Sequence, residues 1–132
     1  MAAERDLAVL LAGLEPVLNP GRYVYCTFPA KVPAGLRPVA TVAEPEGVTA
    51  VVPQEEADSL GLHYTYVAAW ITLKVHSALD AVGLTAAVAG ALAREGISCN
   101  VVAGFHHDHL FVGADDAERA TAALRGLSAA RS

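Results

Sequence analysis

The sequence predicts an α+β fold of ferredoxin-like units in tandem, with antiparallel sheets and helices on one face. The second half of the chain has the order β-α-β-β-α, which is five of the six elements of a ferredoxin-like unit. The first half repeats short strands and a short helix separated by turn residues. With 132 residues, 54% of them hydrophobic, the chain can form one domain or two very small units that share a sheet. We therefore expect units over residues 1–66 and 67–132.

The first half begins with a helix, because four leucines recur at helical spacing: Leu7, Leu10, Leu11 and Leu14. Segments rich in β-forming residues predict three strands, over residues 22–28, 39–42 and 48–52. Three prolines and a glycine within residues 29–38 predict a loop after the first of these strands. Pro53 predicts the start of a short helix that ends at Gly61.

The second half shows its periodicity more clearly. Strands are predicted over residues 70–76, 97–105 and 109–112. Leu84, Val88 and Leu92 are spaced by four and predict a helix after the first strand, with Gly96 ending it. A last helix follows a capping pattern that begins at Asp115. The sixth element is missing, and it comes either from the first half or from residues 62–68 extending the central strand.

Composition and charge exclude two classes of partner. Nine Lys and Arg against fourteen Asp and Glu give a net charge of −5, with no basic stripe, so nucleic acid is not expected. No apolar run approaches the roughly 18 residues of a transmembrane helix, and the first residues do not resemble a signal peptide. We therefore expect a cytoplasmic protein that does not bind membranes. Cys26 and Cys99 are predicted to be buried thiols and not a disulfide.

The most informative stretch is Val82-Gly83-Leu84-Thr85, where a strand is predicted to pass through a glycine turn into a helix. The first turn of a helix has unpaired N–H groups, and the helix dipole favours an anion beside them. We expect these N–H groups to receive a carboxylate and Asp80 to accept from an ammonium group. The candidate ligand loop comprises Asp80, Ala81, Val82, Gly83, Leu84 and Thr85. In the alternative interpretation, Asp80 or Thr85 only caps the helix and Gly83 only permits a tight turn.

Two further segments are candidates for a site. Residues Glu46, Gly47, Val48 and Thr49 share a Gly-aliphatic-Thr core with the loop above, as a duplicated regulatory fold would, although coincidence also explains three residues. The turn His106-His107-Asp108-His109 has the ligand types of a transition-metal site. Three adjacent residues in a tight turn seldom converge on one ion, so we expect a polar hairpin turn and no metal site. No nucleophile with a base is visible, so no catalytic residue is expected.

Four segments together resemble a known family. They are residues 14–25, residues 46–53, residues 79–85, and residues 97–112 with their Gly-Phe-His-His-Asp-His turn. In this order they are similar to the small bacterial ACT-domain proteins with two fused ACT-like units. They are more distantly similar to the ACT units of eukaryotic cytosolic arginine sensors. The resemblance spans nearly the whole chain and implies tandem ACT units.

The resemblance implies a regulatory function without catalysis. ACT domains typically bind small ligands, most often amino acids, at the loop between their first strand and first helix, which here is residues 77–84. We therefore expect a small-molecule ligand, an amino acid, and no cofactor. No arginine is near this loop in the sequence, which favours a neutral or basic amino acid. The open sheet edges predict a homodimer. Two alternatives stay open, a metal-binding protein or enzyme that uses His106–His109, and an interaction module without a ligand.

Overall fold

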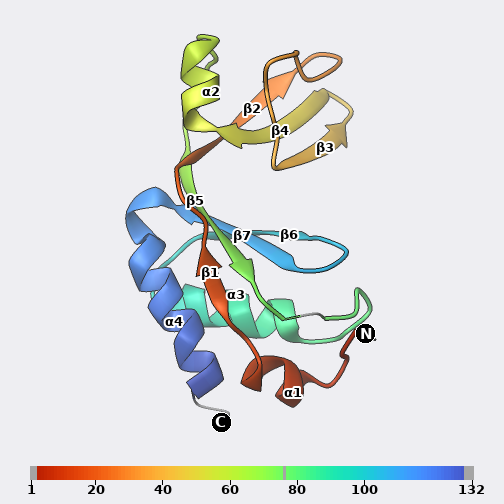
Figure 1. Cartoon of the computed structure of the whole chain (residues 1–132), viewed down its shortest axis with the longest axis vertical. Helices are drawn as coiled ribbons and strands as arrows, with labels where there is room; N and C mark the ends of the chain where they lie inside the picture. Colours follow the sequence, from red (N-terminus) through yellow and green to blue (C-terminus); the bar gives the residue numbers. More distant parts are fainter. Residues whose placement is uncertain (1–2, 76, 130–132) are drawn as a thin grey trace.

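The computed structural model describes residues 3–75 and 77–129. Its helices are α1 (Leu7–Ala12), α2 (Gln54–Ser59), α3 (Leu84–Arg94) and α4 (Ala117–Ala129), with a short 3₁₀ turn over Ala114–Asp116. Its strands are β1 (Pro16–Leu18), β2 (Tyr23–Phe28), β3 (Ala40–Glu44), β4 (Gly47–Pro53), β5 (Val67–Leu73), β6 (Cys99–Ala103) and β7 (Asp108–Gly113). Figure 1 shows α2 with β2, β3 and β4 at one end of the molecule, and α1, α3 and α4 at the other.

One antiparallel sheet runs through both ends of the molecule, in the order β3-β4-β2-β5-β7-β6. Strand β5 is common to both halves. Its first residues, Val67 and Ala68, pair with β2, and Ala68–Leu73 pair with β7. Strand β5 is therefore the last strand of the first ferredoxin-like unit and the first strand of the second. This arrangement confirms the predicted fold class of tandem ferredoxin-like units.

Strand β1 completes the second unit. It pairs antiparallel with β5, with Pro16 opposite Leu73 and Leu18 opposite Ile71. The missing sixth strand of the second unit is thus supplied by the first half of the chain, which is one of the two expected origins. Helix α1 also packs with α3 and α4. The division of the chain between residues 66 and 67, just before β5, stays a prediction.

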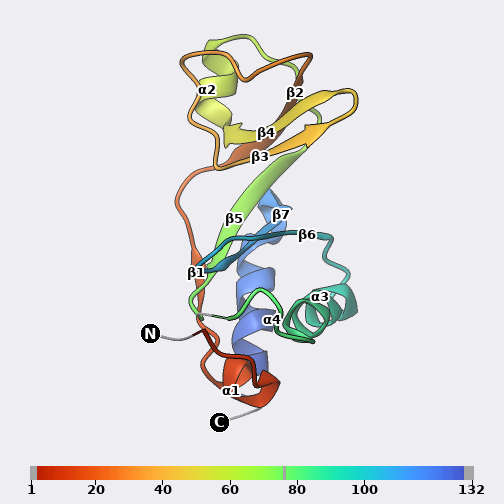
Figure 2. The same ribbon diagram turned by 90° about the vertical axis from the view of Figure 1, so that its right-hand side faces the viewer.

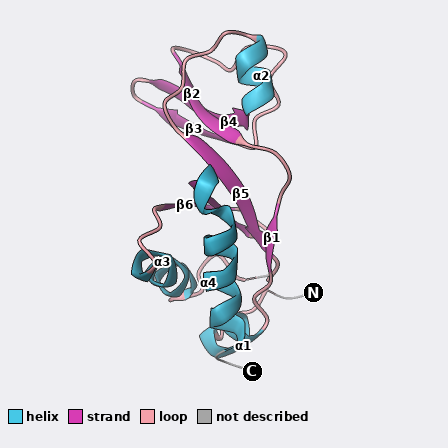
Figure 3. Ribbon diagram, turned by 90° about the vertical axis from the view of Figure 1, so that its left-hand side faces the viewer, coloured by secondary structure: helices cyan, strands magenta, loops and turns pink. Residues whose placement is uncertain are grey.

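Helices cover one face of the sheet at each end of the molecule (Figures 2 and 3). In the second unit, Leu84, Val88 and Leu92 of α3 are buried against Ile71 and Leu110 of the sheet, as their spacing predicts. The same core holds Leu10, Leu11, Leu14, Ala69, Leu73, Ile97, Val112, Ala120 and Leu124. A smaller core lies under α2 in the first unit, formed by Val24, Cys26, Phe28, Leu36, Ala50, Val52 and Ala57.

The opposite face of the sheet is curled, so that side chains of the two units meet there. We name this group the aromatic cluster, and it comprises Tyr23, Tyr25, Tyr66, Trp70 and Phe111 with Val39, Ala40, Val51, Ala68 and Val102 around them. Trp70 contacts Tyr23 edge to face, with ring centroids 5.4 Å apart, and lies nearly parallel to Phe111 at 6.4 Å. Aromatic pairs at these separations add stabilisation beyond the area that they bury.

Several boundaries differ from the sequence-based expectation. The strand expected over residues 70–76 ends at Leu73, because the Val75 N–H turns back to the Leu73 carbonyl at 2.9 Å. His76 lies outside the described residues. Cys26 and Cys99 are free thiols, and Cys26 is buried as predicted, whereas Cys99 is only half-buried. Among the described residues, no helix is both long enough and apolar enough to cross a membrane.

Candidate functional site

The predicted ligand loop leads into α3 through a left-handed glycine. Gly83 precedes the first helical residue, has φ +101°, and provides no side-chain cap. Neither Asp80 nor Thr85 caps α3, because no side chain among the described residues accepts a hydrogen bond from the first turn of this helix. Within the described chain, the N–H groups of Val82, Gly83 and Leu84 have no hydrogen-bond acceptor. These are the donors that the sequence predicts for an anion.

Asp80 is held by a residue that the sequence did not place near it. Arg5 Nε lies 3.0 Å from Asp80 Oδ1, and Ala78 N donates to the Glu4 carbonyl at 2.9 Å, so the N-terminal segment runs beside the loop. The Asp80 side chain is 71% exposed, and this ion pair is correspondingly weak. The expectation that no arginine lies near the loop is wrong, because the fold brings Arg5 to Asp80. An acidic ligand is therefore no longer disfavoured on that ground.

A small hollow lies at the start of α3. Its volume is about 60 Å³, and its lining includes Ser77, Ala78, Leu79, Ala81, Leu84, Thr85, Ala103 and Asp108. Asp108, the first residue of β7, is among the residues that line this hollow. Burial raises the pKa of Asp108, while the nearby His109 and His107 lower it. No salt bridge among the described residues holds this carboxylate. An ammonium group at this position would therefore gain a half-buried partner.

Asp108 is the site residue that sequence reasoning missed. The sequence separates it from Thr85 by a helix and a strand, and only the pairing of β6 with β7 brings it back to the loop. Because histidines flank Asp108 on both sides, the sequence indicated it only as a candidate metal ligand of the His106–His109 turn. The signal for Asp108 in the sequence is the polar turn itself, which places a carboxylate among three histidines.

Residues 46–49 do not join this loop. They form the β3–β4 hairpin of the first unit, at the opposite end of the molecule from the start of α3 (Figure 1). Gly47 has φ +146°, and a Cβ there would lie 2.2 Å from the Phe28 carbonyl oxygen. Thr49 Oγ1 donates a hydrogen bond to Glu44. Each of these features has a structural explanation within the first unit.

The histidine turn does not converge on one point. His109 Nδ1 accepts a hydrogen bond from Trp70 Nε1 at 3.0 Å, and so turns toward the aromatic cluster. The ring of His106 lies edge to face against Phe105, with centroids 5.1 Å apart. Within residues 3–75 and 77–129, no group of three or more His, Cys, Asp or Glu side chains could hold a metal ion.

A larger hollow of about 440 Å³ lies at the first unit, between the turn before β2 and the start of α2. Its lining includes Gly21, Arg22, Gln54 and Glu55. Arg22 Nη2 lies 4.0 Å from Asp115 Oδ1, and both side chains are exposed. The volume exceeds that of the α3 hollow, but the Gln54 amide already donates to the Tyr64 hydroxyl, and Arg22 and Glu55 are exposed to solvent. We therefore regard the start of α3 as the better candidate.

Two family models, both for ACT domains, match this chain. One matches residues 2–69 and the other residues 66–126. A Vibrio cholerae protein of unknown function, named a possible transport protein, has a similar structure. It is 45% identical, with a TM-score of 0.83, over 92% of this chain and 95% of its own. No curated protein sequence matches the chain.

More distant structures share the fold at lower identity. A protein from Agrobacterium tumefaciens is 20% identical, with a TM-score of 0.71, over 87% of this chain and 89% of its own. The ligand-free regulatory subunit of aspartate kinase from Thermus thermophilus is 13% identical, with a TM-score of 0.63, over 85% of this chain and 95% of its own.

Proposed function

Because this chain belongs to the ACT-domain family, we propose that it is a non-catalytic regulatory protein that binds an amino acid at the start of α3. The observation that carries the proposal is the set of unpaired N–H groups at Val82, Gly83 and Leu84 beside the hollow that Asp108 lines. The N–H groups supply donors for an α-carboxylate, and Asp108 supplies an acceptor for an α-ammonium. The proposed site is Asp80–Thr85 together with Asp108, and Asp80 stays at its rim, paired with Arg5.

The volume of the hollow limits what it encloses. About 60 Å³ is near the share of two water molecules in the liquid, which is about 30 Å³ each. This space accepts the charged head of an amino acid, while the side chain of the ligand would extend outside it. Residues 46–49 could reach such a ligand only from a second copy of the chain.

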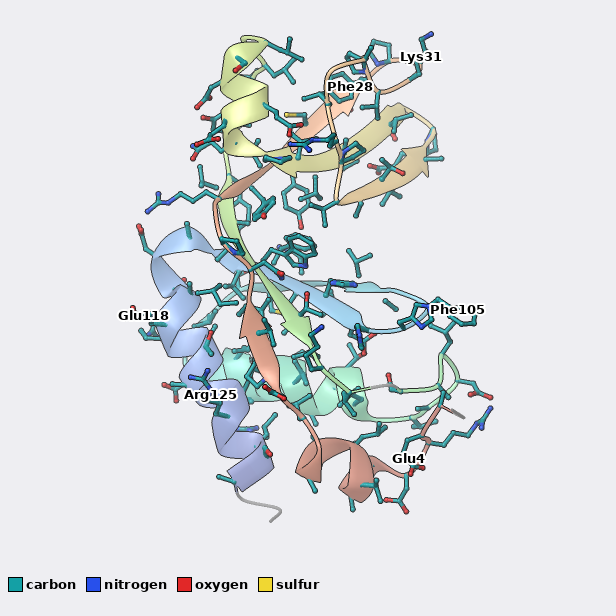
Figure 4. The ribbon with its side chains drawn as sticks, viewed as in Figure 1. Glu4, Phe28, Lys31, Phe105, Glu118 and Arg125 are labelled. Atoms are coloured by element: carbon teal, nitrogen blue, oxygen red, sulfur yellow. The ribbon has the colours of Figure 1, made fainter. Side chains whose placement is uncertain are left out.

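We also propose that the protein is a cytoplasmic homodimer. Large apolar side chains surround the loop without cover: Leu79 is 66% exposed, Val82 84% and Phe105 74%. Figure 4 shows Phe105 projecting at the end of the β6–β7 hairpin. Exposed apolar groups gathered beside a site are typical of an interaction surface. A second copy on this surface would also cover the ligand.

A thermal-shift screen of the twenty amino acids tests the ligand class. A ligand that binds only the folded state raises the free energy of unfolding by about 2.7 kcal/mol at roughly a hundredfold its dissociation constant. We expect a shift with at least one amino acid, and Asp108→Asn should remove most of it. Asp115→Asn is the matched control, because it removes a fully exposed carboxylate that does not line the hollow, and its shift should persist.

Two results would redirect the proposal. If no amino acid shifts the unfolding temperature, a ligand-free interaction module becomes the better account. If purified protein holds stoichiometric metal that is lost when His107 and His109 are changed to Ala, a metal-dependent function replaces the amino-acid site.

A further inference from the structure

A third hollow lies on the other face of the sheet, at the edge of the aromatic cluster. Its volume is about 120 Å³, and its lining includes Val39, Ala40, Trp70, Val102, His109 and Phe111. Val39 and Ala40 belong to the first unit, and the other four side chains come from β5, β6 and β7 of the second. The hollow is therefore built by both units. Small-molecule sites occur preferentially at such junctions.

The walls of this hollow are apolar apart from one imidazole. The rings of Trp70 and Phe111 lie nearly parallel, inclined by 19°, and the His109 ring centroid is 5.7 Å from that of Trp70. Because Trp70 Nε1 donates to His109 Nδ1, the neutral imidazole carries its proton on Nε2. The charged groups that influence His109 are His107, Asp108 and Lys74, and none of them is among the residues lining the hollow.

These features determine the ligand that the hollow suits. An apolar cavity of this order of size stays dry and accepts a molecule such as benzene. A zwitterion would lose its hydration there without gaining a charged partner, which disfavours amino acids. We propose that this hollow is a second small-molecule site, separate from the start of α3, that takes one small neutral aromatic ring between the two units. The bound ring would contact both units and stabilise the curled arrangement of the sheet.

Trp70 makes the proposal directly testable, because it is the single tryptophan of the chain. Phenol, which is neutral at pH 7, is the probe. We expect phenol to change Trp70 fluorescence saturably and to raise the unfolding temperature, whereas phenylalanine should leave the fluorescence unchanged. A phenol response that stays linear up to the solubility limit would overturn the proposal, because it would show collisional quenching without a site.

A filled hollow should not bind the ring. Ala40→Leu adds a side chain at the wall, and phenol binding should weaken by roughly tenfold or more because the space is occupied. Ala43→Leu is the matched control, since Ala43 lies on the same strand, is exposed, and does not line the hollow. Equal phenol affinity in the two folded variants would rule out this hollow as the site.

A measurement on the unmodified protein covers the case in which Ala40→Leu does not fold. In a phenol titration followed by NMR, we expect the largest shifts at the Trp70 indole N–H and the methyl groups of Val39 and Val102. Shifts centred on Val82–Leu84 instead would contradict the proposal. Within the described part of the chain, this hollow and the one at the start of α3 share no lining residue. We therefore expect the phenol response to survive Asp108→Asn and an amino-acid response to survive Ala40→Leu.

Discussion

Trp70 Nε1 donates a hydrogen bond to His109 Nδ1 across β5 and β7, with the two nitrogens 3.0 Å apart. Thr72, which is directly opposite His109 in the strand register, places its hydroxyl 3.3 Å from the same nitrogen. The Asn19 side chain donates to that hydroxyl at 2.9 Å. A polar chain therefore runs along the edge of the aromatic cluster and keeps one imidazole in a fixed orientation.

This contact predicts a pH dependence of stability. Burial lowers the pKa of His109 below its ordinary value of 6.5, and the His107 charge lowers it further. Below pH 6.5 the unfolded chain takes up a proton here before the folded chain does. The stability that His109 contributes is therefore complete above pH 6.5 and is lost as the pH falls from there through the folded pKa.

Urea unfolding at about pH 7.5 and about pH 5.5 measures this effect through the change in midpoint. His109→Asn keeps an acceptor near the position of Nδ1 but does not titrate, so its loss of stability on acidification should be smaller. His63→Asn removes an exposed histidine and should behave as the wild type. Asp108 acts with the opposite sign, because burial raises its pKa, but it is present in all three proteins. Equal losses in the wild type and His109→Asn would contradict the prediction.

The aromatic cluster also contains two hydroxyl groups without partners. The hydroxyl oxygens of Tyr25 and Tyr66 are buried and make no hydrogen bond, and burial raises the pKa of Tyr25 to about 12. A buried polar group without a partner costs roughly 1–3 kcal/mol. Tyr66→Phe should therefore leave the free energy of unfolding unchanged or raise it by up to about 1 kcal/mol.

Tyr64→Phe provides the contrast, because the Tyr64 hydroxyl accepts from Gln54 and donates to Asp58. Its removal should lower stability by roughly 0.5–1.5 kcal/mol in urea unfolding. If Tyr66→Phe destabilised the protein as much as Tyr64→Phe, the Tyr66 hydroxyl would have a partner that this account lacks.

Gly83 combines a structural role with the proposed binding role. Its φ of +101° is unfavourable for other residues, and a Cβ there would lie 3.0 Å from Leu7 Cδ2. Gly83→Ala should lower the free energy of unfolding by on the order of 1 kcal/mol or more. Gly96→Ala, at the other end of α3, has φ +72° and open space around the added methyl, so it measures the backbone cost alone.

The same pair of variants separates folding from binding. With the ligand shift compared at equal folded fraction, Gly83→Ala should show a reduced amino-acid response, and Gly96→Ala should retain it. A full amino-acid response in Gly83→Ala would show that Gly83 does not take part in binding and serves only as a turn residue.

The sequence predicted those elements whose pattern repeats over several turns or residues. The spacing of Leu84, Val88 and Leu92 was sufficient to place α3 and its buried face. Strand β1 could be foreseen only as one of two origins for the sixth strand, because a three-residue strand carries too little pattern. The alternation in β5 suggested one apolar face, yet Thr72 is buried on the other, where its hydroxyl contacts Asn19 and His109.

The candidate site was predictable where it depends on local backbone. The glycine turn before α3 and its unpaired N–H groups follow from residues 82–84 alone. Arg5 and Asp108 could not be assigned in this way, because one is 75 positions from its partner Asp80 and the other reaches the hollow through the pairing of β6 with β7. Contacts that depend on the register of a sheet leave no periodic signal in one sequence.

Amide NMR measures the central claim most directly. The amino acid that gives the largest thermal shift would be titrated into ¹⁵N-labelled protein while the backbone N–H resonances are followed. The account predicts saturable shifts at Val82, Gly83 and Leu84, with affinity matching the thermal shift, and their loss in Asp108→Asn. If these three resonances stay in place while those of residues 46–49, or of Gly21 and Gln54 at the larger hollow, move, the amino acid binds elsewhere and the assignment of the α3 start as the ligand site is wrong.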